Sequence, residues 1–448
     1  MKFNQPLYDY VLQATKTFEE SLDTRPVTPN TVSVKNLSCF EEPLSKKGAE
    51  ALEVIKMLYE TGEPGVVSSR GGRYYGFVTG GALPVAVAAN WLAASWDQNG
   101  GPSVMSPTSA KIEEVAGNWV LDLLNLPKKS DFSFVTGATM AGFTAISAAR
   151  NRMYKQLGYN VKEDGIRNAP KIRFIMSDEI HPTNIIALQY MGYGKSELEF
   201  VPCDEQGRIN PSLIPSLDDH SIVLLQAGNV NSGAFDPIDE VANLVKDTGA
   251  WLHVDAAFGG WVRACHSRSF LTRGMERADS WALDCHKWMN VTHDSAIAIC
   301  RRPDAISEMF GVQAAYLVQG SLREPNHYTP ELSRRARGIE IWATLKHLGK
   351  DGFNDLVERT CNHAKYIAEE LEKLGFEILN EVVINQVVAT MDDDKIDDFI
   401  TTVQKSGKTW FGPTYWKGRK AFRISISSHA TKKNDVDIAL SAIKEAIS

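Results

Sequence analysis

Six apolar segments of strand length, all between residues 131 and 302, constrain the fold of this chain more than any other feature. They begin with FSFVTG at 132–137, end with SAIAICRR at 295–302, and are separated by helical patterns or turns. Short apolar strands that alternate with helices form a mainly parallel sheet that is covered on both faces. The sequence therefore predicts an α/β fold. Ligands in such folds bind at the carboxyl ends of the strands, so polar residues there are the first candidates for a site.

The chain divides into three predicted parts. Residues 1–68 are expected to form a helical arm, since the apolar residues of GAEALEVIKMLYETGEPG follow a helical period. Residues 69–345 form the large domain with the sheet, and residues 346–448 form a small C-terminal α+β domain. The arm has too little apolar material for a core of its own, so we expect it to pack on another domain or subunit.

The composition excludes several classes of protein. With 48 basic and 55 acidic residues, the net charge of −7 argues against nucleic acid as a partner. The N-terminus lacks the apolar region of a signal peptide, and the most apolar stretch, 81–95, is too short to span a membrane. The six cysteines show no CxxC spacing, so we expect no zinc or other metal site and reduced thiols in the cytoplasm.

Lys287 lies in DCHKWMN, between the apolar segments SWALD and SAIAIC. Most lysines are exposed on the surface, but these flanks predict a partly buried one. A lysine amine that is partly removed from water can act as a nucleophile near neutral pH. Its characteristic use is a Schiff base with a carbonyl, most often that of pyridoxal phosphate.

Asp255 ends the apolar run WLHVD and precedes the small residues Ala256 and Ala257. A buried carboxylate requires a partner. One interpretation is that Asp255 caps the next helix. The other is a salt bridge to a pyridinium nitrogen, which keeps the ring protonated as an electron acceptor. The two alanines would let a flat ring lie against the strand end.

Three other strand ends carry candidate ligands of a cofactor. In VTGATMAG, a strand ends and a helix opens, which exposes backbone N–H groups suited to a phosphate. His181 in SDEIHPT is either a structural histidine or an imidazole that stacks on the cofactor ring. The amides and hydroxyls of QAGNVNSG suit the ring oxygen of the cofactor. The candidates at these positions are Gly137, Ala138, Thr139, Asn231 and Ser232.

The segments HVDAAFGG and CHKWMN resemble the group II pyridoxal-phosphate decarboxylases, which have the fold type I of aspartate aminotransferase. This family includes aromatic L-amino-acid, histidine and glutamate decarboxylases. SDEIHPT, SRRARGIEIWATLKHLG and RISIS are also similar to the family, and the likeness covers residues 70–440. The resemblance implies a seven-stranded sheet in the large domain, pyridoxal phosphate as cofactor, and a homodimer with the active site at the interface.

The same resemblance implies roles for single residues. Lys287 would bind the cofactor covalently, Asp255 would bind the ring nitrogen beside Ala257, and His181 would stack on the ring. The phosphate would be held by Gly137, Ala138, Thr139 and His286. The chain departs from the family at Asp284, where an asparagine is usual. A carboxylate there would repel a phosphate, so no phosphate contact is assigned to Asp284.

The resemblance implies decarboxylation of an L-amino acid, in which a loop tyrosine from the partner subunit returns a proton to Cα. Tyr328 in REPNHYTPE is the candidate for this acid, the alternative being a solvated loop residue. Loss of such an acid would favour oxidative aldehyde formation.

The substrate is weakly encoded in the sequence. The aromatic and apolar residues of GGRYYGFVTGG and WLAASWDQNGG favour an aromatic or apolar side chain, although such residues are as often plain core. Arg337 or Arg323 could instead bind an acidic side chain. Aminotransferases and carbon–sulfur lyases share this fold, and Arg423 could hold an α-carboxylate as aminotransferases of the fold do. The predicted substrate residues are Phe77, Thr79, Trp96, Val104 and Arg337.

Overall fold

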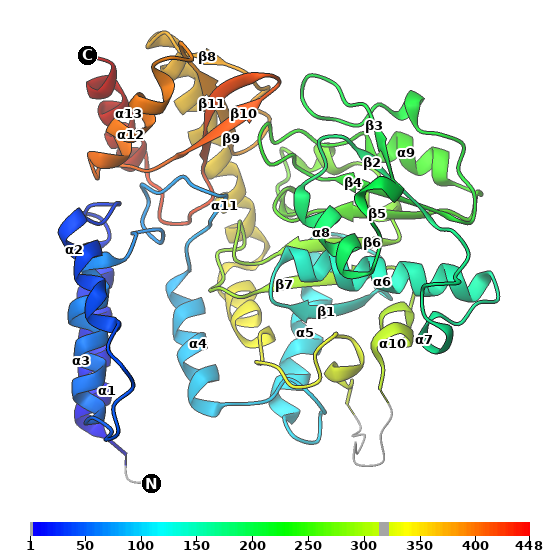
Figure 1. Cartoon of the computed structure of the whole chain (residues 1–448), viewed down its shortest axis with the longest axis horizontal. Coiled ribbons are helices and arrows are strands. Elements are labelled where there is room, and N and C mark those ends of the chain that lie inside the picture. The colour runs from blue at the N-terminus through cyan, green and yellow to red at the C-terminus, as the bar shows by residue number, and fades with distance from the viewer. Residues whose placement is uncertain (1–2, 313–321) are drawn as a thin grey trace.

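A seven-stranded sheet forms the centre of the computed structural model, which describes residues 3–312 and 322–448 (Figure 1). Its order is β1–β7–β6–β5–β4–β2–β3, and only β7 is antiparallel to its neighbours. The strands are β1 Asp131–Val135, β2 Arg173–Ser177, β3 Leu198–Val201, β4 Ser221–Gln226, β5 Trp251–Asp255, β6 Ser280–Asp284 and β7 Ala296–Cys300. The predicted α/β fold with a mainly parallel sheet is confirmed.

Thirteen α-helices are present in the described part of the chain. They are α1 Gln5–Ser21, α2 Thr31–Asn36, α3 Ala51–Gly62, α4 Pro84–Trp96, α5 Pro107–Leu123, α6 Ala138–Gln156, α7 Val161–Asp164, α8 Pro182–Tyr190, α9 Ile238–Val245, α10 Ala305–Phe310, α11 Gly338–Lys373, α12 Ile396–Lys405 and α13 Lys433–Ile447. Short 3₁₀ segments supplement them, among them η5 Gly259–Ala264 and η8 Pro325–His327.

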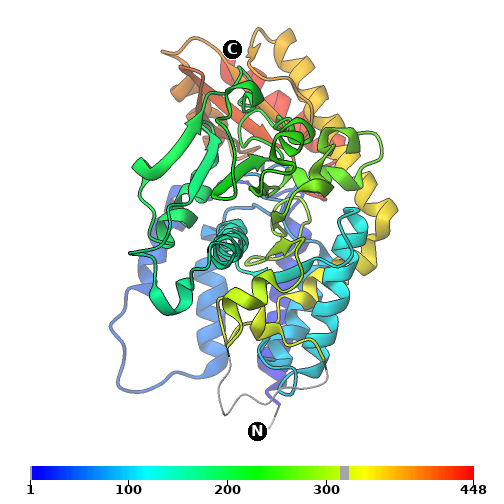
Figure 2. The same cartoon turned by 90° about the vertical axis from the view of Figure 1, so that its right-hand side faces the viewer.

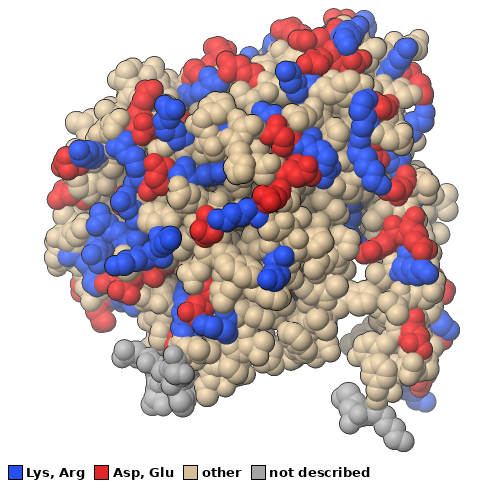
Figure 3. Space-filling view, turned by 180° about the vertical axis from the view of Figure 1, so that it is seen from behind, with Lys and Arg blue, Asp and Glu red and all other residues tan. Residues whose placement is uncertain are grey.

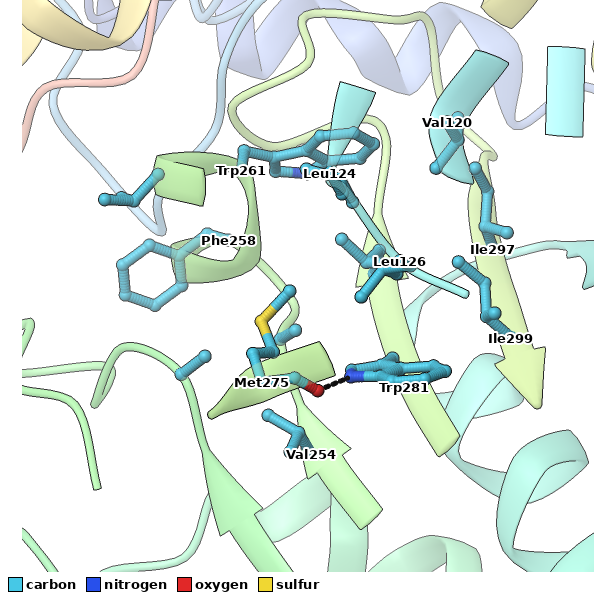
Figure 4. Close-up of a cluster of buried hydrophobic side chains, with 14 of the residues drawn as sticks. Val120, Leu124, Leu126, Val254, Phe258, Trp261, Met275, Trp281, Ile297 and Ile299 are labelled. Carbon is cyan, nitrogen blue, oxygen red and sulfur yellow. Dashed lines mark hydrogen bonds between the residues drawn. The ribbon is translucent and has the colours of Figure 1, made fainter. Parts of the chain in front are cut away.

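Both faces of the large sheet are covered. Along β4, Ile222 and Leu224 belong to the core on the side of α6, whereas Val223 and Leu225 belong to the core on the opposite side. Figure 4 shows part of the second core, where the Trp281 indole donates a hydrogen bond of 2.9 Å to a backbone carbonyl. Because both faces are buried, the strands in the middle of the sheet are mainly apolar and do not alternate with polar residues.

A second sheet lies at the end of the molecule that holds the C-terminus (Figures 1 and 2). It is antiparallel, with the order β10 Gly412–Trp416, β11 Arg419–Ser425, β9 Gln386–Thr390 and β8 Glu377–Ile378. Helix α11 passes from the large sheet to this one and crosses the predicted boundary between residues 345 and 346. Gly349 interrupts it with a φ of 59°, a conformation that glycine adopts without steric cost.

The N-terminal helices α1 and α3 stand beside the body of the molecule (Figure 1). Helices α1 and α3 pack on each other, and neither contains a buried residue. Apolar side chains on the arm are exposed, and so are several on the neighbouring helix α4. These are Tyr8, Leu12, Val54, Leu58, Trp91, Leu92 and Trp96.

The surface is mixed in charge. Basic and acidic side chains are interspersed over the face in Figure 3. Within residues 3–312 and 322–448, no helix is long and apolar enough to cross a membrane. The same residues contain no group of three or more histidine, cysteine, aspartate or glutamate side chains that could hold a metal ion.

Candidate active site

A cavity of about 220 Å³ lies at the carboxyl ends of β1, β2, β4, β5 and β6. This is the edge of the sheet at which the sequence predicted a site. Polar groups and small residues from five separate strand ends line it. They are Gly137, Ala138, Thr139, His181, Thr183, Gln226, Gly228, Val230, Asp255, Ala257, Phe258, Asp284, His286 and Lys287.

The structure brings eight of the ten predicted cofactor residues into this lining. They are Gly137, Ala138, Thr139, His181, Asp255, Ala257, His286 and Lys287. The sequence reasoning missed Thr183, Gln226, Gly228, Val230 and Phe258. Gln226 could have been identified from the sequence, because it is the last residue of β4 and ligands bind at strand ends in such sheets.

The segment that carries Lys287 is held on several sides. The Lys287 amine lies over the Phe258 ring, 5.8 Å from its centroid. The Gly80 amide donates to the His286 carbonyl at 3.3 Å, and a β-carbon on Gly80 would overlap the Lys287 carbonyl oxygen. The Asn290 amide donates to the carbonyls of Trp288 and Ser427 at 2.8 and 2.9 Å. These contacts fix the backbone of Lys287, so the position of its Cα relative to the cavity is defined.

Asp255 is buried, with 8% of its surface exposed, at the end of the central strand β5. Its Oδ1 accepts a hydrogen bond from the Ala257 amide at 3.1 Å, and its Oδ2 accepts one from Asn184 Nδ2 at 2.6 Å. No lysine, arginine or histidine nitrogen of the described residues lies within 4.0 Å of the carboxylate oxygens. A buried carboxylate with neutral partners can accept a cationic group from a ligand.

Asp284 lies between the lysine segment and the start of α6. Its Oδ2 accepts a hydrogen bond from the Ala138 amide at 3.3 Å, which is the first amide of that helix. Its Oδ1 accepts from the His286 amide at 3.0 Å and lies 2.9 Å from His286 Nδ1. The His286 ring stacks on His293 with centroids 4.0 Å apart. A carboxylate at this helix end is favoured by the helix dipole but adds negative charge to an anion-binding position.

His181 caps the N-terminus of α8 and faces the cavity. Its Nδ1 lies 2.7 Å from Thr183 Oγ1 and accepts from the Thr183 amide at 3.3 Å. Burial lowers the pKa of His181, and the charge of Asp255 partly opposes this effect. The ring is therefore neutral near pH 7, with Nδ1 as acceptor and the proton on Nε2.

Asn231 and Ser232 do not line the cavity, contrary to the prediction that they face a cofactor ring oxygen. Asn231 Oδ1 accepts from Thr414 at 2.7 Å, and the Ser232 hydroxyl donates to the Gln206 carbonyl at 2.6 Å. The cause is Asn229, whose side-chain oxygen accepts the backbone amides of both residues and turns the loop away.

Tyr328 also lies outside the cavity lining of its own chain. It is half-buried at the end of η8, and the Arg323 guanidinium lies 3.6 Å from its ring centroid. Arg323 donates to the Phe132 carbonyl and also contacts Glu113. Burial raises the pKa of Tyr328, so its hydroxyl stays protonated at neutral pH.

None of the predicted substrate residues lines the cavity. Phe77, Trp96 and Val104 are 67%, 45% and 58% exposed. Thr79 directly precedes Gly80, and its amide donates to the Gly76 carbonyl. Arg337 is buried and donates to both carboxylate oxygens of Asp294, at 3.1 and 3.2 Å.

Arg423 on β11 approaches the cavity from the second sheet. Its guanidinium donates to the carbonyl of Val230, a lining residue, at 2.8 Å. Burial lowers the pKa of Arg423 to about 10, and its positive charge contributes to the lowered pKa of His181. The side chain is therefore a charged group close to the cavity but outside its lining.

The chain is similar to known amino-acid decarboxylases. The chain is 26% identical to an aromatic-L-amino-acid decarboxylase of Bacillus atrophaeus over 365 residues, which is 78% of this chain and 73% of that protein. It is 28% identical to the acidic amino acid decarboxylase GADL1 of Mus musculus, over 62% of this chain and 52% of that protein.

The fold is shared with the crystal structure of Oryza sativa TDC with PLP and tryptamine. The TM-score is 0.89 at 19% identity, over 99% of this chain and 97% of that one. The model of the pyridoxal-dependent decarboxylase conserved domain matches residues 35–391. The chain therefore belongs to the pyridoxal-dependent decarboxylase family, as a carboxy-lyase with pyridoxal phosphate as its cofactor.

Proposed function

We propose that this enzyme removes the α-carboxylate of an L-amino acid with an aromatic or apolar side chain, giving the amine and CO₂. The observation that carries the proposal is the donor set of one cavity. It combines the Lys287 amine, the buried Asp255 carboxylate and the N-terminus of α6. These three groups fit the aldehyde, the ring nitrogen and the phosphate of pyridoxal phosphate.

Each group of the cavity would do a separate task. Bound pyridoxal phosphate supplies an electron sink, because its protonated ring accepts the electron pair that CO₂ leaves on Cα. Lys287 would hold the aldehyde covalently, and Asp255 would keep the proton on the ring nitrogen. The neutral His181 ring, fixed by Thr183, would lie against the cofactor without adding charge. Gly137, Ala138, Thr139 and His286 would bind the phosphate.

Both arginines that the sequence offered for an acidic substrate side chain already have partners. Arg337 pairs with Asp294, and Arg323 is held between Phe132 and Tyr328 and contacts Glu113. These contacts support an aromatic or apolar substrate side chain over an acidic one.

Arg423 supports a second candidate function. A half-buried guanidinium close to the cavity suits a substrate carboxylate, either on an acidic side chain or at Cα. A tight contact with the α-carboxylate would stabilise the ground state and hinder its loss. The experiment must therefore distinguish two alternatives. One is decarboxylation of an acidic amino acid, and the other is an aminotransferase or lyase reaction.

The test is to incubate the holoenzyme with a panel of aromatic, aliphatic and acidic L-amino acids while CO₂, amine, ammonia and peroxide are measured. We expect CO₂ and amine in equal amounts from the aromatic or aliphatic members. Turnover of the acidic members alone would overturn the proposed substrate class. Ammonia with peroxide would instead indicate aldehyde synthesis, and transfer of the amino group without CO₂ would overturn decarboxylation.

Tyr328 remains our candidate for the acid that protonates Cα. Its raised pKa keeps the hydroxyl protonated, as a general acid requires. Because Tyr328 lies outside the cavity of its own chain, the role requires the cavity of a second copy. In the same panel, Tyr328→Phe should shift the product from amine towards aldehyde, ammonia and peroxide.

Replacing Asp284 by asparagine is expected to tighten cofactor binding roughly tenfold, the scale of one hydrogen bond to a charged group. The reason is that an amide can donate to the phosphate, whereas the carboxylate repels it. Equilibrium titration of cofactor-free protein with pyridoxal phosphate measures the change. Asp294→Asn is the control, since Asp294 pairs with Arg337 and does not line the cavity. Unchanged or weaker binding by Asp284→Asn would contradict this account.

We also propose a homodimer with the active site at the interface. The apolar side chains that α1, α3 and α4 leave exposed are of the kind that protein interfaces bury. The 220 Å³ cavity is smaller than the roughly 300–1,000 Å³ of pockets that enclose drug-sized ligands, which supports completion of the substrate site by a second copy. The free state of all six cysteines suits the cytoplasm, which we propose as the location.

Sedimentation of the holoenzyme should give twice the chain mass of 49.6 kDa. Leu92→Glu on α4 should lower the dimer fraction and the activity together, because it places a charge on the proposed interface. Leu213→Glu, at an equally exposed leucine outside these helices, should change neither. A fully active monomer would contradict the dimer proposal.

A further inference from the structure

The carboxylate of Asp255 has one side-chain partner among the described residues, the amide of Asn184. The distance of 2.6 Å between Nδ2 and Oδ2 is short for a hydrogen bond to oxygen, as charge-assisted hydrogen bonds are. Asn184 is 2% exposed and lies in the first turn of α8. It does not line the cavity, whereas Asp255 does, so the amide supports the carboxylate from behind the lining.

The orientation of the Asn184 amide follows from its neighbours. The same Nδ2 donates to the His181 carbonyl at 3.3 Å and to Asp255 Oδ2. Both partners are acceptors, so the NH₂ group must face them, and the reversed amide would place its oxygen against two oxygens. Asn184 Oδ1 points towards α6, where a β-carbon on Gly142 would lie 3.9 Å from it.

A neutral donor has a specific consequence at this position. A hydrogen bond to the ionised carboxylate stabilises its negative charge. A lysine or arginine in the same place would also neutralise that charge and would compete with a cationic ligand group. With an amide, the negative charge of Asp255 stays available on the cavity side.

We infer that Asn184 is a positioning residue for Asp255, which keeps this carboxylate ionised and aimed at the ring nitrogen of the cofactor so that the nitrogen stays protonated. The inference rests on the proposed role of Asp255 at the ring. The sequence HPTN, 181–184, then acts as one unit at the start of α8. His181 faces the cavity, Thr183 fixes its Nδ1, and Asn184 joins the His181 carbonyl to Asp255.

The test follows the proton on the ring nitrogen. Holoenzyme is prepared with pyridoxal phosphate labelled with ¹⁵N in the ring, and the ¹⁵N chemical shift is recorded against pH. Asn184→Leu removes the donor at similar volume, and Asn184→Asp is isosteric but puts a carboxylate beside Asp255. The control is Gln189→Leu, the same change from amide to aliphatic at an exposed position of α8. Circular dichroism identifies the variants that fold.

In the wild type and in Gln189→Leu, we expect a protonated ring nitrogen across neutral pH. In both Asn184 variants the shared proton should move towards the carboxyl group, so the ¹⁵N signal at neutral pH should shift towards the unprotonated position. The kcat should fall roughly ten- to a hundredfold, the equivalent of one hydrogen bond to a charged group, with little change in KM. If Asn184 had only a structural role, the protonation of the ring nitrogen would not change in these variants.

The outcomes distinguish the proposed role of Asp255 from the inferred role of Asn184. A wild-type ring nitrogen that is unprotonated would sink the proposed role of Asp255 and the inference with it. A protonated wild-type nitrogen that titrates identically in a folded Asn184 variant would overturn the inference alone. If Asn184→Leu does not fold, the isosteric Asn184→Asp decides the question in the same way.

Discussion

Alanine at position 287 should abolish covalent fixation of pyridoxal phosphate and lower turnover by a factor on the order of 10⁴, the upper range for losing one acid–base or nucleophilic group. Lys287 is the one primary amine among the described residues that line the cavity. Its backbone is held by hydrogen bonds that involve Gly80 and Asn290. The variant should still fold, because the Lys287 side chain makes no hydrogen bond or ion pair with the described residues.

Borohydride reduction followed by peptide mass spectrometry directly measures the covalent attachment of pyridoxal phosphate to Lys287. In the wild type, the cofactor mass should appear on the peptide that contains Lys287, and the purified protein should be yellow. Lys287→Ala should show no modified peptide. The control is Lys350→Ala, because Lys350 is exposed and pairs with Asp122. Fixation on another lysine in the wild type would overturn the central assignment of the site.

Asparagine at position 255 is expected to lower kcat by roughly 10²–10³, the cost of removing one preorganised electrostatic partner of the transition state. The substitution keeps the shape of the side chain but removes the charge that would hold the ring nitrogen protonated. The cofactor should still attach to Lys287, since the amine and the N-terminus of α6 are unchanged.

A cofactor analogue with carbon in place of the ring nitrogen gives the matching control. With this analogue, wild type and Asp255→Asn should be equally slow, because the proposed partner of Asp255 is missing in both. Asp239→Asn, at an aspartate that pairs with Arg277 outside the cavity, should retain full activity with the natural cofactor. A wild-type kcat in Asp255→Asn would exclude the charge of Asp255 from the mechanism.

The strands could be predicted because burial on both faces makes each one a continuous apolar run. Strand β3 was missed among these runs, since it is a four-residue edge strand in which Phe200 is exposed. Lys287 and Asp255 could be predicted as site residues because each lies at or near the end of an apolar strand. Burying a charged side chain there costs free energy unless it has a partner or a function.

Side-chain direction in the loops could not be predicted in the same way. Asn231 and Ser232 have the right chemistry and lie shortly after β4, yet Asn229 turns their loop towards Gln206 and Thr414. These partners come from segments remote in the sequence. The same holds for Arg337, whose partner Asp294 lies 43 positions away and occupies its guanidinium.

The sequence by itself determined the α/β class, the strand ends that line the candidate site, and the amine, carboxylate and helix N-terminus proposed for it. Each of these depends on local pattern, because apolar runs and the breaks between them are read along the chain. The tertiary structure alone decided which groups meet. It placed the Asn184 amide on Asp255, set Asp284 on the first amide of α6, and left Phe77, Trp96 and Val104 exposed. Such contacts join residues from different strands and helices, and only the packing of these elements fixes their distances.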